Sequence, residues 1–84
     1  MPVISSFGGI VIKMYFAHSE HNPPHFHAYY NGRGATFDIR TLPVLDGQLP
    51  PKQRLMVTEW ATVYREQLMK IWDTQEFEKI PPLN

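Results

Sequence analysis

The chain has 84 residues, which is enough for one small domain and too few for two. Hydrophobic residues make up 43%, which excludes a disordered chain, and eight basic residues balance eight acidic ones, which excludes a global basic field for nucleic acid. A local basic patch and a homodimer stay open, because a formal charge of zero gives little repulsion between copies.

The sequence lacks the marks of export. It has no cysteine, whereas secreted domains of this size usually need disulfide bonds. The first residues carry no signal-peptide pattern, and the apolar runs are too short to cross a bilayer. We therefore expect a cytoplasmic protein with no membrane partner.

The first half of the chain predicts β-strands joined by tight turns. Gly8-Gly9 and Asn31-Gly32 are turn signals, and Asn-Gly favours a type I′ hairpin because both residues tolerate positive φ. The expected strands are residues 3–7, 10–16, 25–30, 35–40 and 44–45.

The hairpin around Asn31-Gly32 decides which side chains share a face. A two-residue turn places His25 opposite Asp38, and a four-residue loop places His27 opposite Asp38. Both registers keep the same side chains on each face, since they differ by two residues. A one-residue slip is disfavoured, because it would bury the charged set. The expected core face holds Phe26, Ala28, Tyr30, Ala35, Phe37 and Ile39. The expected polar face holds His25, His27, Tyr29, Thr36, Asp38 and Arg40.

The second half predicts one long helix that opens at Pro50-Pro51 and runs to about Asp73. Apolar residues recur there at spacings of three and four and should cover the sheet. They are Met56, Trp60, Val63, Tyr64, Leu68 and Ile71. An extended tail follows, with Phe77, Ile80 and Leu83 as packing anchors.

These patterns predict a single α+β domain over residues 1–84. Residues 1–49 are mainly strands, 50–73 form the helix and 74–84 form the tail. The expected architecture is an antiparallel β-meander of three to five strands, with the one long C-terminal helix packed across one face.

The polar face suggests acid–base chemistry. A carboxylate beside an imidazole stabilises its charged form and orients the ring, so the candidate catalytic residues are His25, His27, Asp38 and Arg40. If the protein is an enzyme, metal-independent cleavage of RNA suits this set. Cross-strand pairing that only stabilises the hairpin is the alternative.

Two further kinds of site are suggested by residue type. The candidate phosphate or nucleic-acid contacts are Arg33, Arg40, Lys52 and Arg54. Lys52 and Arg54 are included because cations in a first helical turn oppose the helix dipole, which hints at an anion nearby. A divalent metal such as zinc has His21, His25 and His27 as candidate ligands, with His18 or Asp38 as a fourth. Ordinary surface histidines are the alternative to that metal site.

Five segments are informative when taken together. The most specific is Asn22-Pro23-Pro24-His25-Phe26-His27, and the others are residues 1–5, 9–15, 47–50 and 80–83. These segments resemble a small bacterial family, domain of unknown function 4160. The resemblance covers essentially the whole chain and implies a prokaryotic cytoplasmic protein with a cognate small protein partner, in an operon that resembles a toxin–antitoxin pair. It implies no catalytic residues.

The leading interpretation is therefore a toxin–antitoxin-like operon component that binds a cognate protein, and also nucleic acid, through its histidine-rich sheet face. A metal-binding domain built on the histidine cluster is the second interpretation. A non-catalytic transcriptional regulator or interaction module is the third, although one helix cannot form a helix-turn-helix pair.

Overall fold

The computed structural model describes residues 3–15, 23–42 and 44–83. Five strands follow one another in an antiparallel sheet whose spatial order is the order of the chain. They are β1 (Val3–Phe7), β2 (Ile10–Lys13), β3 (His25–Tyr30), β4 (Arg33–Asp38) and β5 (Val44–Gly47). The predicted α+β meander is confirmed.

The hairpin between β3 and β4 closes through a two-residue turn. Asn31 has φ 53° and Gly32 has φ 80°, which is the geometry expected of a type I′ turn. This turn lets β4 begin at Arg33, two residues before the predicted strand, and β4 ends at Asp38, so Arg40 belongs to the following turn.

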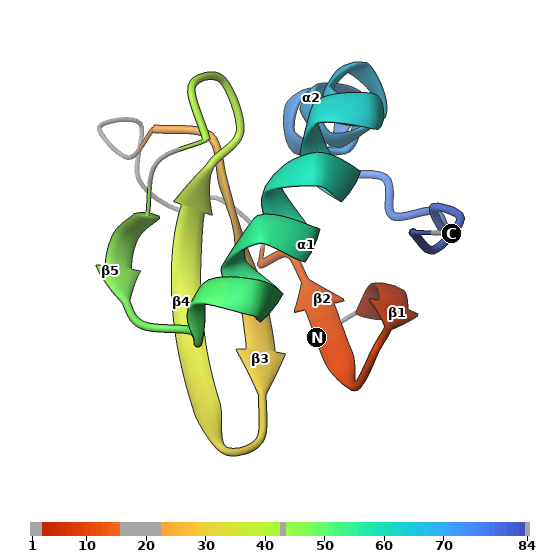
Figure 1. Ribbon diagram of the computed structural model, residues 1–84. Helices are drawn as coiled ribbons and strands as arrows, with labels where there is room; N and C mark the ends of the chain where they lie inside the picture. The colour runs from red at the N-terminus through yellow and green to blue at the C-terminus, as the bar shows by residue number, and fades with distance from the viewer. Residues whose placement is uncertain (1–2, 16–22, 43, 84) are drawn as a thin grey trace.

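The expectation of one long helix is wrong, because the helical region divides at Tyr64. Helix α1 spans Pro51–Val63 and α2 spans Arg65–Thr74, with Tyr64 at φ −106° and ψ 22° between them. A straight helix over residues 51–74 would be about 36 Å long, whereas the longest dimension of the molecule is 31 Å. The break turns α2 away from the direction of α1 (Figure 1), and α2 buries Leu68 and Ile71 in the core.

The division also changes which helical side chains are buried. Val63 was expected on the apolar stripe but is 69% exposed. The buried face of α1 consists instead of Val57, Trp60 and Ala61, at the spacing of three and four that one helix face requires. The buried residues of α2, Leu68 and Ile71, agree with the predicted stripe.

The core lies between the helices and one face of the sheet, with Trp60 at its centre. The Trp60 ring lies 5.5 Å from Phe7 and 5.9 Å from Phe26, measured between ring centroids. Its indole N–H donates a hydrogen bond to the carbonyl of Pro81 at 2.9 Å. This bond satisfies the polar atom of a buried tryptophan and ties the tail to the core.

The tail covers the β1 edge of the sheet. The Ile80 N–H donates to the carbonyl of Ile4 at 2.8 Å, and the Ile80 side chain is buried. The C-terminal segment therefore lies beside β1 (Figure 1). Neither helix is long and apolar enough to cross a membrane, judged over the described residues.

Candidate functional site

The β3–β4 register places His25 and His27 on the sheet face opposite α1. His25 pairs with Asp38, Phe26 with Phe37 and His27 with Thr36, as the two-residue turn predicts. Phe26 and Phe37 are fully buried and stack with their planes 4° apart, so the intervening positions must point outward. The predicted parity of the two strands is confirmed.

Five aromatic and imidazole rings form a continuous series that runs from α2 along this outer face, and we call this series the ring row. It consists of Trp72, His25, His27, Tyr15 and Tyr29. Ring centroids are separated by 5.0 Å between Trp72 and His25, and by 5.2 Å between His25 and His27. Tyr15 packs edge-on against His27 at 4.5 Å, and Tyr29 lies 6.3 Å from His27. The row thus joins β3, α2 and the segment that follows β2.

A backbone contact orients His25. Its Nδ1 lies 2.8 Å from the carbonyl oxygen of Pro23. Since a carbonyl only accepts, Nδ1 must carry the hydrogen and donate it. In neutral His25 the lone pair is therefore on Nε2, the nitrogen that can accept a proton or bind a ligand.

His27 has a different environment from His25. Its Nδ1 lies 3.2 Å from Oγ1 of Thr36, and a hydroxyl can serve either tautomer because it both donates and accepts. Burial lowers the pKa of His27 below its ordinary value of 6.5, and the nearby charge of His25 lowers it further. His27 therefore favours the neutral form, which suits a general base.

Two phenols and one cation end the row. The hydroxyls of Tyr15 and Tyr29 are hydrogen-bonded at 2.6 Å. That bond, together with burial and the charge of Tyr15, raises the pKa of Tyr29 to about 12, so Tyr29 stays neutral. The Lys13 ammonium lies 5.5 Å from the Tyr29 ring centroid, within the range of a cation–π contact.

Asp38 serves the turn that follows β4. Its Oδ1 accepts hydrogen bonds from the backbone N–H of Arg40 at 2.8 Å and of Thr41 at 3.3 Å. The side chain is 8% exposed, and within the described part of the chain neither imidazole is hydrogen-bonded to it. Its pairing opposite His25 is observed, and its catalytic role stays a prediction.

The predicted cations do not gather at one place. Arg33 begins β4 beside the hairpin turn, and Arg40 lies in the turn after β4. Lys52 and Arg54 are on α1, which covers the opposite face of the sheet (Figure 1). Lys13, in contrast, contacts the ring row through Tyr29. Val11, Lys13 and Tyr15 occupy every second position of the predicted strand 10–16, which places all three on the outer face.

The proposed metal ligands fall partly outside the structure. His18 and His21 are not among the described residues. Over residues 3–15, 23–42 and 44–83, no group of three histidine, aspartate or glutamate side chains is arranged to hold a metal ion. The site made of His21, His25 and His27 therefore stays a prediction.

The fold and the outer face together define a small α+β protein in which rings line the sheet face opposite α1. The chain belongs to the family described as domain of unknown function DUF4160, whose model matches residues 9–73. The match includes the whole ring row. No curated protein and no solved structure matches the chain.

Proposed function

We propose that this protein is the RNA-binding member of a toxin–antitoxin-like operon, with the ring row as the surface that holds single-stranded RNA. The observation that carries the proposal is the continuous series of rings that begins at Trp72 on α2 and runs to Tyr29 along the sheet face opposite α1. The operon context and the cognate protein partner are taken from the family resemblance.

The chemistry of the rings supports single-stranded RNA in particular. Unpaired bases stack on aromatic and imidazole rings, and each such contact is worth about 1–3 kcal/mol in binding free energy. Sheet surfaces bearing aromatic side chains are a recurrent way to bind single strands. The half-buried rings of His27 and Tyr29 lie side by side on β3, and Lys13 supplies a positive charge for the backbone phosphates.

The composition agrees with a small, local contact. A formal charge of zero argues against long-range attraction of duplex DNA. Stacking on rings depends less on charge than phosphate contacts do, so it suits a neutral protein. We therefore expect moderate affinity with a shallow dependence on salt concentration.

Fluorescence anisotropy with a labelled single-stranded RNA of twelve uridines tests the proposal. We expect saturable binding at low ionic strength, weakened about tenfold or more by His27→Ala, since one stacked base is lost. Lys13→Ala should weaken binding, whereas Lys70→Ala, an equal charge change on the exposed side of α2, should not. Absence of binding, or equal affinity of all four proteins, would reject the proposal.

RNA cleavage is the second candidate function, and the neighbouring imidazoles favour it. His27, with its lowered pKa, would take the proton of a 2′-hydroxyl as that oxygen attacks the phosphorus. His25, in its protonated form, would give the proton on Nε2 to the departing 5′-oxygen, which leaves a 2′,3′-cyclic phosphate, and Arg40 would contact the phosphate. Incubation with RNA should yield cyclic-phosphate ends that are absent with His27→Ala. Intact RNA in both reactions would reject the cleavage hypothesis and leave RNA binding as the only proposed function.

A further inference from the structure

The second edge of the sheet differs from the first. At β1 the tail supplies a hydrogen-bonding partner through Ile80. At the other edge, β5 pairs with β4 through Ala35 and Thr36, and no other described strand lies beyond it. An uncovered edge presents backbone N–H and C=O groups that can pair with another extended chain.

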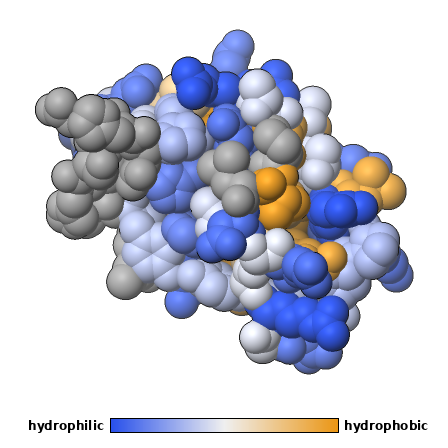
Figure 2. Space-filling model, turned by 90° about the vertical axis from the view of Figure 1, so that its left-hand side faces the viewer, coloured by the Kyte–Doolittle hydropathy of each residue, from blue (hydrophilic) through white to orange (hydrophobic). Residues whose placement is uncertain are grey.

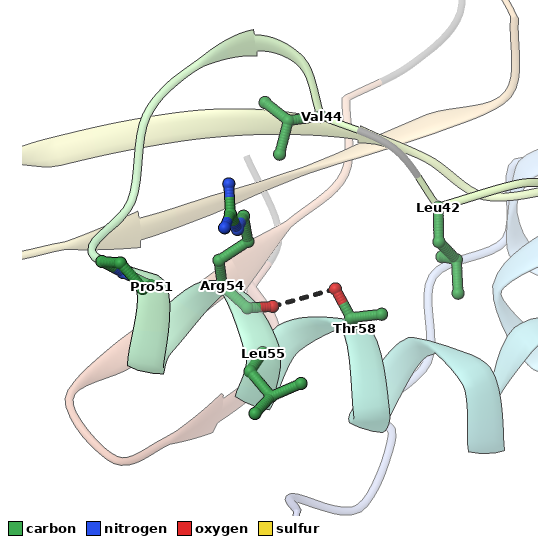
Figure 3. Close-up of a pocket in the computed structure, with 6 residues that line it drawn as sticks. All are labelled: Leu42, Val44, Pro51, Arg54, Leu55 and Thr58. Carbon is green, nitrogen blue, oxygen red and sulfur yellow. Dashed lines mark hydrogen bonds between the residues drawn. The ribbon is translucent and has the colours of Figure 1, made fainter.

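A groove runs between this edge strand and α1. It has a volume of about 520 Å³ and is lined by Leu42, Val44, Pro51, Arg54, Leu55 and Thr58. Figure 3 shows Val44 on the strand side, and Leu55 and Thr58 on α1, with Leu42 near the far end. Viewed from the β5 side, the molecule has apolar surface set among polar atoms (Figure 2). Leu55 is 59% exposed, so its side chain adds apolar surface to the groove lining.

One cation stands in this groove. The Arg54 side chain extends from α1 toward Val44 (Figure 3), and it also lines the adjoining hollow beside Gly47 and Gln48. Within the described ranges no carboxylate forms an ion pair with it. A guanidinium in that position favours a ligand with a carboxylate, which it can bind with two parallel hydrogen bonds.

We propose that the β5 edge and this groove bind an extended segment of the partner protein that carries an acidic residue flanked by apolar ones. The segment adds a strand to β5, so its backbone provides affinity while alternate side chains enter the groove. The carboxylate meets Arg54, and the apolar side chains cover Leu55 and Val44. This inference rests on the proposed protein partnership and names its surface.

A second copy of this chain fits the groove less well. A two-fold axis at β5 would bring two identical grooves together, with one Arg54 from each copy. Like charges brought together at an interface are unfavourable. A partner strand with an acid has the complementary charge, and for that reason we assign the groove to a partner and not to a second copy.

Selection from a phage-displayed library of random seven-residue peptides on the purified full-length chain tests this proposal. We expect the selected peptides to share an acidic residue between β-branched or aromatic ones. When the Arg54→Glu protein is the target, the selected peptides should carry a basic residue in place of the acidic one. Lys52→Glu makes the same charge change in the first turn of α1 but outside the groove lining, so it should select the wild-type peptides.

Binding of one selected peptide, made synthetically, then separates the contributions. We expect Arg54→Glu to weaken it about tenfold or more, Leu55→Ser to weaken it less, and backbone N-methylation of the peptide to abolish it. Both substituted residues are exposed, so circular dichroism should show unchanged folding. The proposal is overturned by selection that Arg54→Glu leaves unaltered, by full binding of the N-methylated peptide, or by a wild-type dimer that excludes the peptide.

The RNA experiment is independent of this one, because the ring row lies on the other face of the sheet. Arg54→Glu should keep wild-type affinity for the labelled RNA. Loss of peptide binding with intact RNA binding places the partner at β5. Failure of RNA binding in every protein, with peptide binding intact, rejects the proposed RNA surface and leaves the docking surface standing.

Discussion

The imidazole of His25 and the indole of Trp72 lie 5.0 Å apart, centroid to centroid, with their planes inclined at 57°. The contact joins the outer face of β3 to α2, which also contributes Leu68 and Ile71 to the core. Trp72 is only partly buried and also packs against the core cluster. One side chain therefore links the hydrophobic core to the ring row.

Replacing Trp72 should weaken both the fold and the ring row. A fully buried aromatic costs about 3–5 kcal/mol when truncated to alanine, so we expect about 2 kcal/mol for the partly buried Trp72→Ala. Urea unfolding followed by circular dichroism measures the change. Trp72→Phe keeps a ring beside His25 and should lose less. An unaltered unfolding free energy for Trp72→Ala would show that the contact contributes nothing.

The lowered pKa of His27 predicts how stability depends on pH. The unfolded chain takes up a proton at this residue near pH 6.5, whereas the folded protein takes it up only at lower pH. Stability is therefore fully present above pH 6.5 and is lost as the pH falls toward the folded-state pKa. Melting temperatures between pH 7.5 and 5.5 should fall more steeply for the wild type than for His27→Gln. Parallel curves for the two proteins would contradict the assigned pKa shift.

Asp38 is expected to matter for the turn at Arg40 and Thr41. Asp38→Ala removes the acceptor of two backbone N–H groups and should cost about 1–3 kcal/mol of stability. Asp38→Asn retains one carbonyl oxygen and should restore most of the loss. Equal losses in the two variants would show that the negative charge, and not the turn hydrogen bonds, is the source of the effect.

Two glycines with the same backbone angle allow a matched test of the β4–β5 pairing. Gly32 and Gly47 have φ of 80° and 79°. A Cβ at Gly32 would meet open space, whereas one at Gly47 would overlap the carbonyl oxygen of Gly34. We expect Gly32→Ala to cost about 1 kcal/mol for the positive φ alone and Gly47→Ala to cost clearly more. Equal unfolding free energies for the two variants would mean that β5 moves away without cost.

The sequence predicted the outer face well because strand parity is a local property. Asn31-Gly32 selects the turn, the turn selects the register, and the alternation from His25 to Tyr30 then decides which side chains point outward. The same alternation placed Lys13 and Tyr15 on the face opposite Ile12. Their contact with β3 depends on the pairing of Lys13 with His27, which connects two separate hairpins.

The parts that could not be predicted depend on tertiary contacts. Neither proline nor glycine marks the break at Tyr64, which separates α1 from α2. Without that break the sequence does not predict the contact between Trp72 and His25. The carboxylate of Asp38 could turn toward His25 or toward the backbone after β4, and strand spacing does not distinguish these two arrangements.

The central claim is that the ring row holds single-stranded RNA, and chemical-shift mapping tests it most directly. Adding an unlabelled oligouridine to the ¹⁵N-labelled protein should shift the backbone amides of β2 and β3, the Thr36 amide and the indole N–H of Trp72. The amides of α1 should stay in place. Shifts centred on Lys52 and Arg54, or an unchanged spectrum at saturating RNA, would contradict the account.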